Sequence, residues 1–465
     1  MAKKKEKTLE EKLQEALVPE NQWPYILPEN WCWTRLDFIA NYKKGPFGSS
    51  LTKAMFVPKG KNTYKVYEQG NAINKSTQYG SYYITKEKYD SMDGFSVEPN
   101  DIIVSCAGTI GEIFRLPQNI EKGIINQALM RVRLNSSVVY QIFEYYFSKI
   151  LIQNITDESN GTAIKNIPPF KVLKQMPFPL PPLPEQKRIV HRIESLFAKL
   201  DEAKEKIQQV LDGAEMRKVA ILHKAFAGEL TQNWRKENGI SEDSWVEYTL
   251  QSVCTMKITD GTHKTPTYSD KDNGVVFLSA KDITSGEINW ENTKYITSEL
   301  HTELYSRLAP QINDILLAKN GTTGVAALVK EDKVFDIYVT LALLRPDLEI
   351  VIPEYLLNII NSPICKVQFN ENLTGIGVPN LHLRDIKDVK IKVPSISEQE
   401  IISDKVEMLL ANEGMVTKNC LKQIEVIDTM KKSILAKAFR GELGTNNPTE
   451  YSALNLLKEV LQDKS

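Results

Sequence analysis

The sequence predicts an α+β protein built from one unit written twice. We expect two similar globular domains separated by two long antiparallel coiled-coil helices, with a pseudo-twofold internal repeat. The stretches ILHKAFAGEL (221–230) and ILAKAFRGEL (434–443) agree at eight of ten positions and lie 213 residues apart. DIIVSCAGTIG (101–111) and DILLAKNGTTG (314–324) keep the same offset, including both glycines. Self-similarity at one fixed offset is the signature of an internal repeat.

Two further pairs of segments lie between these anchors. PEQ (184–186) aligns with SEQ (397–399) at offset 213, and GTAIKNI (161–167) meets GIGVPNL (375–381) at offset 214. A single-residue insertion therefore separates the copies locally, and the duplication covers most of each globular domain and the helix that follows it.

Each copy ends in a segment with apolar residues spaced alternately by three and four positions. This spacing is typical of a helix that packs along another long helix. The predicted seam is Ile189, Ile193, Leu196, Leu200, Ile207 and Val210 in the first copy, and Ile402, Val406, Leu409, Val416, Ile427 and Ile434 in the second. Gly228 and Gly441 follow the last seam residues, where glycine favours a left-handed helix stop.

The order of these elements along the chain predicts the architecture. If the two seams pack together, the second helix has to run antiparallel to the first, because each helix starts beside its own globular domain. Within the domains, short apolar runs bounded by glycine, asparagine or proline predict strands. The expected segments are an N-terminal helical segment (1–20), a first globular domain (21–182), a first long helix (183–230), a second globular domain (231–395), a second long helix (396–443) and a C-terminal tail with a short amphipathic helix (444–465).

The composition predicts a cytoplasmic protein that holds no metal. Hydrophobic residues make up 42% and charged residues 25% of the chain, without an apolar run of membrane-spanning length. The N-terminal stretch MAKKKEKTLEEKL lacks the apolar region of a signal peptide. The five cysteines are scattered and never in CxxC spacing, which indicates free thiols rather than disulfides or a zinc site.

Charge is distributed unevenly between the two globular domains. The net charge of the chain is −1, but residues 21–182 carry 18 basic and 13 acidic residues, whereas 231–395 carry 17 and 22. The first domain is therefore at +5 and the second at −5. Residues 41–75 contain seven lysines and one acid, Glu68. Such a cluster is compatible with a solvated surface or with a nucleic-acid partner.

Glycine-rich loops are the candidate binding segments. They are KKGPFGSSLTK (43–53) and SCAGTIG (105–111) in the first domain, and TDGTHKTP (259–266) and KNGTTG (319–324) in the second. Glycines let backbone N–H groups approach a phosphate, and Ser, Thr, Asn and Lys supply further donors. The amides of Asn126–Gln127 suit an adenine edge. The structural alternative is that these loops are tight turns.

Catalytic motifs are missing from the sequence. The nearest match to the [DNS]PP[YF] motif of amino-methylating DNA methyltransferases is IPPF (167–170), where Ile167 replaces the polar first residue. There is no GxxxxGK[ST] phosphate loop and no nuclease cluster. We therefore expect a chain that is not an enzyme and carries no cofactor of its own.

The segments PLPPLPEQKRIVHRIESLF (179–197), AFAGELT (225–231), GPFGSSL (45–51) and DGTHKTP (260–266) together give the chain a family resemblance. It closely resembles the specificity (S) subunit of type I restriction–modification systems. The resemblance implies that each globular domain is a target-recognition domain reading one half of a bipartite DNA sequence. It also implies that the paired helices set the spacer and dock two methyltransferase subunits, which restriction/translocase subunits join in phage defence.

S-adenosylmethionine, ATP and magnesium would then belong to the partner subunits. The predicted DNA-contacting residues of the first domain are Lys43, Lys44, Gly45, Phe47, Gly48, Ser49, Ser50, Lys53, Ser105, Gly108, Thr109, Asn126 and Gln127. Those of the second domain are Asp260, Gly261, Thr262, His263, Lys264, Thr265, Lys281, Asn320, Thr322 and Thr323.

Two other functions remain open at this point. A tandem-repeat protein-interaction scaffold without DNA binding explains the helices and the acidic second domain, but leaves the lysine cluster without a purpose. A self-sufficient methyltransferase needs motifs that the sequence lacks.

Overall fold

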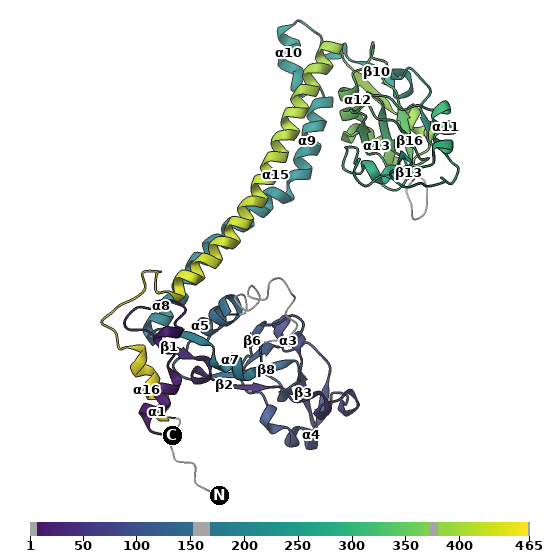
Figure 1. The fold of residues 1–465 in the computed structure, drawn as a ribbon. Coiled ribbons are helices and arrows are strands. Elements are labelled where there is room, and N and C mark those ends of the chain that lie inside the picture. The colour runs from purple at the N-terminus through teal and green to yellow at the C-terminus, as the bar shows by residue number, and fades with distance from the viewer. Residues whose placement is uncertain (1–6, 152–167, 372–379, 464–465) are drawn as a thin grey trace. The chain divides into compact units, whose positions relative to one another are not determined.

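The computed structural model describes residues 7–151, 168–371 and 380–463, which form two compact units (Figure 1). Unit 1 comprises residues 1–205 and 424–465, and unit 2 comprises residues 206–423. The boundaries fall inside the long helices, so each unit holds one globular domain together with a part of both helices. The repeat anchor GTAIKNI and most of its counterpart GIGVPNL lie outside the described residues.

Unit 1 contains a main antiparallel sheet and a smaller mixed sheet. The main sheet has the order β2 (Ala40–Lys44), β8 (Leu129–Leu134), β5 (Ile102–Ser105), β6 (Ile113–Arg115). The mixed sheet has the order β4 (Tyr83–Thr85), β3 (Thr63–Tyr67), β7 (Gly123–Ile125), with β3 and β7 parallel. A separate antiparallel pair joins β1 (Cys32–Arg35) to β9 (Pro177–Leu180).

Unit 2 repeats this topology strand for strand. Its main sheet has the order β11 (Thr259–Asp260), β17 (Leu341–Leu344), β14 (Ile315–Ala318), β15 (Ala326–Leu328). Its mixed sheet has the order β13 (Lys294–Ile296), β12 (Val275–Leu278), β16 (Phe335–Ile337), with β12 and β16 parallel. The separate pair is β10 (Val246–Thr249) with β18 (Lys390–Val393). The predicted duplication is therefore also a duplication of sheet order.

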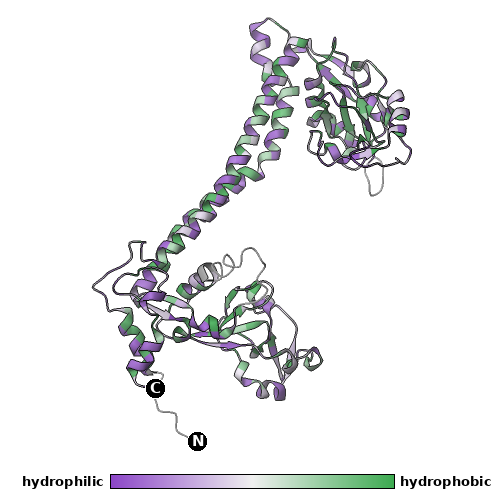
Figure 2. Ribbon diagram, in the orientation of Figure 1, coloured by the Kyte–Doolittle hydropathy of each residue, from purple (hydrophilic) through white to green (hydrophobic). Residues whose placement is uncertain are grey.

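Short helices accompany the sheets in both units. Those of unit 1 are α1 (Leu9–Ala16), α2 (Leu36–Ile39), α3 (Gln69–Ile73), α4 (Lys86–Ser91), α5 (Tyr140–Glu144), which continues as a π-helix (Tyr145–Leu151), α7 (Phe170–Gln175) and α16 (Ala453–Asp463). Those of unit 2 are α10 (Gln232–Glu237), α11 (Ser298–Arg307), α12 (Pro353–Ile360), α13 (Pro363–Glu371) and α14 (Leu383–Asp388). Figure 2 shows hydrophobic residues concentrated on the strands inside each unit.

A buried ion pair recurs at the same place in the two main sheets. Asp101, which precedes β5, accepts from Arg133 Nε at 2.6 Å and Nη2 at 3.0 Å. Asp314, which precedes β14, accepts from Arg345 Nε at 2.8 Å and Nη2 at 2.7 Å. Both carboxylates are buried, and in each case a bidentate arginine compensates for the loss of solvent. The conserved spacing of the two copies thus preserves a specific contact as well as the hydrophobic pattern.

In the first turn of each long helix, a glutamine side chain forms hydrogen bonds with backbone groups of the adjoining globular domain. The Gln186 side chain accepts from Val139 N at 2.8 Å and donates to Ser137 O at 2.7 Å and Pro181 O at 3.0 Å. The Gln399 side chain makes the same contacts in unit 2, with Ile352 N, Ile350 O and Pro394 O, each at 2.9 Å. This explains why PEQ and SEQ are matched in sequence.

The matched AFAGEL and AFRGEL segments lie at the ends of the long helices, where their phenylalanines pack against the globular domains. Phe226 packs edge-on against Tyr355 in unit 2, with ring centroids 5.2 Å apart, and Phe439 packs against Tyr146 in unit 1 at 5.2 Å. The glycines that follow, Gly228 and Gly441, have φ of 81° and 74°, a left-handed conformation that favours glycine.

The first long helix consists of α8 (Leu183–Asp212) and α9 (Ala214–Phe226), which meet at Gly213, and the second is the 44-residue α15 (Ile396–Phe439). In unit 1, ion pairs join Asp201 to Lys431 and Lys204 to Asp428, so α8 and α15 run in opposite directions there. In unit 2, Arg217 Nε binds Glu413 at 2.9 Å, and Lys405 Nζ donates to Leu230 O at 2.7 Å.

The predicted seam is buried most completely near the globular domains. Ile189, Ile193, Ile402, Val406 and Ile427 are buried, whereas Leu196, Leu200, Ile207, Leu409 and Ile434 are half-buried. Val210 and Val416 are the most exposed of the predicted seam residues, at 39% and 40%.

The two terminal helices belong to unit 1. α1 and α16 contact each other and contribute Ala16, Leu457 and Leu461 to the unit 1 core (Figure 1). Asn30 Nδ2 donates to Asn447 O at 3.0 Å, and so holds the C-terminal tail in place. Among the described residues, no helix combines the length and the apolar character that crossing a bilayer requires.

Candidate nucleic-acid interface

Three of the predicted loops of unit 1 meet around one pocket of about 660 Å³. The loops follow β2, β5 and β7, and they bring Lys44, Ala107 and Gln127 to the same place. The full lining is Lys44, Cys106, Ala107, Gln127, Met130, Pro168, Pro169 and Phe170. The sheet order explains this meeting, because β2, β5 and β8 are neighbours and the loops leave from their ends.

Glycine is required where the first loop of each unit leaves its sheet. A Cβ on Gly45 would lie 1.8 Å from Asn126 O, and one on Gly261 would lie 1.9 Å from Ile337 O. No side chain fits at such distances, so a substitution has to displace backbone. Gly45 of GPFG and Gly261 of DGT are therefore required for close backbone packing, which is a structural role.

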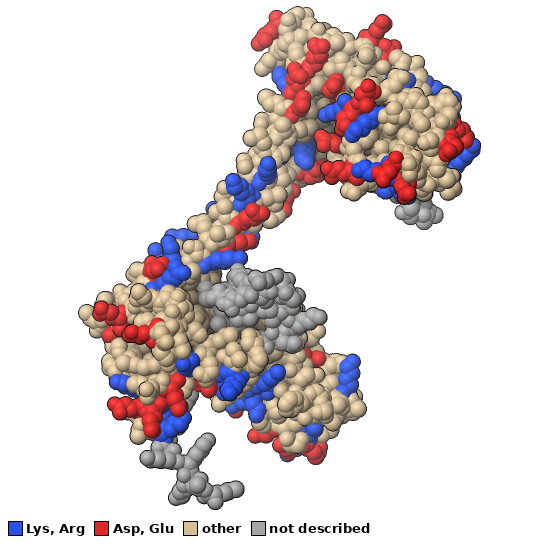
Figure 3. Space-filling model, viewed as in Figure 1, with Lys and Arg blue, Asp and Glu red and all other residues tan. Residues whose placement is uncertain are grey.

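Most of the predicted residues in unit 1 are accessible. Phe47 is 86% exposed, and Lys43 Nζ lies 4.8 Å from the centroid of the Phe95 ring. The other exposed members are Lys44, Gly48, Ser49, Ser50, Lys53, Gly108, Thr109 and Gln127. Figure 3 shows basic side chains gathered over the β2–α7 part of this unit.

One residue predicted to contact DNA in unit 1 has a buried side chain. Ser105 is fully buried, and its hydroxyl donates to Thr109 O at 2.6 Å and accepts from Glu112 N at 2.9 Å. It closes the loop instead of facing a ligand. Asn126 is half-buried and its Oδ1 accepts from Ala128 N at 3.0 Å, which leaves Gln127 as the exposed amide of the pair.

Two residues predicted to contact DNA in unit 2 have buried side chains as well. Asp260 is buried, where its carboxylate binds Lys319 Nζ at 2.8 Å and His263 Nε2 at 3.2 Å. Thr262 is buried as well, and its hydroxyl accepts from Lys264 N at 3.1 Å. These side chains shape the loop, while His263, Lys264 and Thr265 stay exposed.

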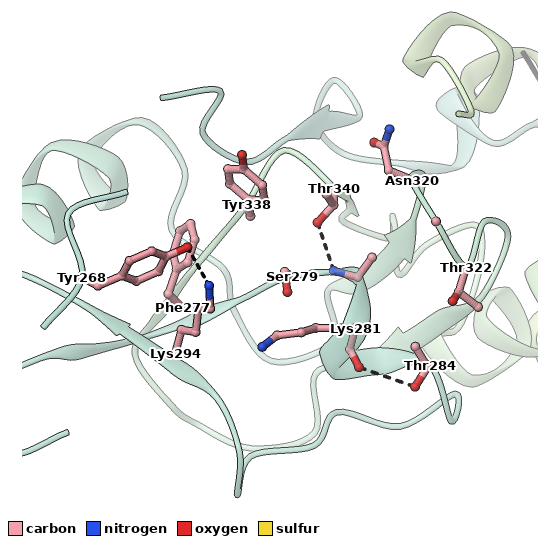
Figure 4. Close-up of a pocket in the computed structure, with 12 residues that line it drawn as sticks. Tyr268, Phe277, Ser279, Lys281, Thr284, Lys294, Asn320, Thr322, Tyr338 and Thr340 are labelled. Carbon is pink, nitrogen blue, oxygen red and sulfur yellow. Dashed lines mark hydrogen bonds between the residues drawn. The ribbon is translucent and has the colours of Figure 1, made fainter. Parts of the chain in front are cut away.

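A pocket of about 470 Å³ brings together the remaining predicted residues of unit 2 (Figure 4). Lys281, Asn320 and Thr322 line it, and Thr323 follows in the same loop. The lining also includes Tyr268, Phe277, Ser279, Ala280, Thr284, Lys294, Gly321, Tyr338 and Thr340. Sequence reasoning missed Tyr268, Lys294 and Tyr338, because they come from separate strands and loops and no local motif marks them.

The cysteine that lines the unit 1 pocket is not a reactive centre. All five cysteines are free, and Cys106, which lines the unit 1 pocket, has its pKa raised to about 12 by burial. A thiol in that state stays protonated at neutral pH and is a poor nucleophile. In the described ranges, no cluster of three or more His, Cys, Asp or Glu side chains has the arrangement of a metal site.

A family model described as "Type I restriction modification DNA specificity domain" matches the chain twice, at residues 28–212 and 242–426. The EcoKI specificity subunit of Escherichia coli K12 is 24% identical over 463 residues, covering 94% of this chain and 96% of that protein. The EcoBI specificity subunit of Escherichia coli is 25% identical over 391 residues, covering 80% and 81%.

Two solved structures share the fold. The HsdS subunit from Thermoanaerobacter tengcongensis superposes with a TM-score of 0.57 at 17% identity, covering 91% of this chain and all of that one. A chain from a study of assembly and conformational transition in the type I R-M system reaches a TM-score of 0.62 at 18% identity, covering 90% and 100%.

Proposed function

Because the chain belongs to the type I restriction–modification DNA specificity family, we propose that it is the non-catalytic subunit that recognises DNA and assembles the complex. The observation that carries the proposal is the double match, once over each copy of the repeat. Two domains with one sheet order and different loops are suited to reading two different half-sites. Each globular domain then reads one half of a bipartite sequence in double-stranded DNA.

The two long helices are proposed to pair as an antiparallel coiled coil along their length and to set the distance between the half-sites. Support comes from the ion pairs between α8 and α15 in unit 1 and between α9 and α15 in unit 2. A two-domain reader of this kind contacts half-sites about one helical turn of DNA apart, or a multiple of it.

The helices also offer a surface for the two methyltransferase subunits. Met216, Met408 and Met415 are 73%, 55% and 62% exposed in unit 2. The exposed valines at positions 210 and 416 extend the apolar character of this stretch. Methionine side chains adapt to irregular partner surfaces, and exposed apolar patches of this kind mark protein–protein contacts.

The chemistry of the complex is assigned to partners. S-adenosylmethionine would bind the methyltransferase subunits, and ATP and magnesium would serve the restriction/translocase subunits. The proposed place of action is the cytoplasm, where the genome lies. This chain contributes the choice of sequence.

The proposal is tested by purifying the tagged chain from its native cells and by sequencing adenine methylation in that genome with and without the gene. We expect a methyltransferase to co-purify and one bipartite methylation motif to vanish in the deletion strain. If no methyltransferase binds and the methylation pattern is unchanged, the chain is a scaffold without a DNA role.

The spacer role predicts a separate outcome. Equal insertions into α8 and α15 that preserve the heptad phase should lengthen the non-specific spacer of the methylated motif and leave both half-sites unchanged. The readout is again the methylation motif, and a lengthened variant that still modifies the original spacing would falsify the ruler function.

A further inference from the structure

The unit 2 pocket is lined by basic but not by acidic side chains, although it belongs to the acidic second domain. Two lysines of the predicted loops are neutralised, since Lys264 pairs with Glu303 and Lys319 pairs with Asp260. The twelve residues that line the pocket include Lys281 and Lys294 but no aspartate or glutamate. The pocket is therefore locally basic although residues 231–395 carry a net charge of −5.

Both lysines are held at defined places. Lys294 Nζ lies 4.2 Å from the centroid of the Tyr268 ring and donates to the Tyr268 hydroxyl at 3.0 Å. Lys281 lies on a short 3-10 helix (Ala280–Ile283), whose first turn is capped because Asp282 accepts from Ser279 N at 2.7 Å. Figure 4 shows the Lys281 side chain extending across the pocket toward Lys294.

The other walls of the pocket are polar at the rim and apolar at the floor. Ala280 N donates to Thr340 Oγ1 at 3.0 Å, which fixes one wall against the connection between β16 and β17 that also carries Tyr338. Phe277 is 2% exposed, and its ring centroid lies 5.9 Å from that of Tyr338. Thr284 and Thr322 also line the pocket. A volume of about 470 Å³ is in the range of small-ligand sites.

We propose that this pocket holds a phosphodiester segment of the DNA strand, with Lys281 and Lys294 neutralising the phosphate and the aromatic floor packing against the sugar. The inference rests on the proposed DNA-reading function. Lysine binds phosphate as a point charge, and contacts of Lys, Thr and Tyr with phosphate fix the register of a protein on the duplex. The acidic second domain then contacts the DNA backbone through a locally basic pocket.

A phosphate fits these groups better than a base edge does. Reading a base takes a side chain free to form paired hydrogen bonds in the plane of the base. Lys294 is already bound to Tyr268, and Asn320 Nδ2 donates to Asn380 Oδ1 at 2.9 Å. An anion, by contrast, needs only the remaining ammonium protons and the charge. The pocket therefore contributes affinity and register, and sequence choice comes from other loop residues.

The test uses the full chain in complex with its methyltransferase subunits and fluorescein-labelled duplexes that do or do not contain the methylated motif. Dissociation constants are measured between about 50 and 200 mM salt for the wild type and for Lys281→Gln/Lys294→Gln. We expect roughly tenfold weaker binding to both duplexes and a salt slope smaller by about 1–2. Lys330→Gln/Lys333→Gln is the matched control, since it removes the same charge from residues of unit 2 that do not line the pocket.

Each outcome separates the pocket from the wider function. Unchanged affinity and salt slope in the pocket variant, with DNA binding by the wild type, overturn the phosphate site alone. Weaker binding only to the motif duplex assigns base reading to the lysines and also overturns it. Failure of the wild-type complex to bind either duplex overturns the proposed function instead.

A second arm distinguishes DNA phosphate from a free anion. Inorganic phosphate is titrated into the wild type and the pocket variant while their thermal unfolding is followed. If phosphate stabilises only the wild type but both proteins bind DNA equally, the pocket is a free-anion site and the DNA proposal fails. Competition of phosphate with DNA in the wild type alone supports the proposal.

Discussion

The first turns of the two long helices carry the same Glu–Gln pair but satisfy the glutamate in different ways. Gln186 and Gln399 make equivalent contacts with backbone groups. Buried Glu398 binds Arg235 Nη1 at 2.5 Å and accepts from Thr231 Oγ1 at 2.6 Å. Buried Glu185 accepts from Trp31 Nε1 at 2.8 Å and from the Thr445 hydroxyl at 3.4 Å.

The difference shows which contacts are the same in both copies at the joint, by which we mean the first turn of a long helix and the segments of the globular domain that contact it. The amide that closes backbone hydrogen bonds is kept in both copies, whereas the partner of the buried carboxylate has diverged from a cation to neutral donors. Burial raises the pKa of Glu185, and the hydrogen bond from Trp31 offsets part of that rise. Burial therefore disfavours the charged form of Glu185 in unit 1, whereas the buried carboxylate of Glu398 in unit 2 has a cationic partner.

The largest effect is expected from Glu398→Gln. This change leaves the Arg235 guanidinium, whose side chain is 7% exposed, without its counter-charge. Removing one partner of a buried ion pair costs about 3–5 kcal/mol, so we expect unit 2 to lose that amount of unfolding free energy. Hydrogen exchange in denaturant, followed on peptides of each unit, measures the loss, and the peptides of unit 1 serve as the internal control.

An intermediate and symmetric effect is expected from Gln186→Ala and Gln399→Ala. Each removes the amide that satisfies one buried N–H and two carbonyl groups, which we expect to cost about 2–4 kcal/mol in the unit concerned. The same exchange measurement should give similar losses for the two variants. A large inequality would show that the joints are not equivalent.

The smallest effect is expected from Glu185→Gln, the same substitution as in unit 2 but at the diverged joint. The amide oxygen still accepts from Trp31, so the unfolding free energy of unit 1 at neutral pH should stay within about 1 kcal/mol of the wild type or rise. A loss as large as that of Glu398→Gln would contradict the comparison.

The same variant tests the raised pKa of Glu185. In the wild type the folded state binds this proton more tightly than the unfolded state. The contribution of this group to stability is therefore fully present below the ordinary glutamate pKa near 4.5 and is lost as pH rises through the raised value. Glu185→Gln should remove this part of the pH dependence of unit 1, measured by urea unfolding across that window.

The duplicated fold could be predicted because identical offsets link segments whose roles are local. The apolar run of β5, the helix start at Gln186 and the glycine at 228 each recur with their neighbours in sequence. The partners of Glu185 and Glu398 could not be predicted, since Trp31 and Arg235 lie 154 and 163 residues away in the chain. The different partners of the two glutamates can be identified only from the structure, because they come from segments that are distant in the sequence.

The candidate site was predicted at the level of loops and less well at the level of side chains. The predicted segments of unit 1 do meet at one pocket, because neighbouring strands end there, whereas only the 319–324 loop of unit 2 lines the pocket of that unit. Whether a polar side chain in such a loop turns inward depends on its hydrogen-bond partners, and Ser105, Asp260 and Thr262 turn inward. Tyr268 and Lys294 join the pocket from outside the predicted loops.

The central claim is that each globular domain reads one half of the DNA target. Its most direct test replaces residues 242–395 by the corresponding domain of a relative with a different target, keeping both long helices, and determines the methylation motif in cells. We predict that one half of the motif changes, while the other half and the spacer remain. A motif altered in both halves, or not altered at all, would contradict the account.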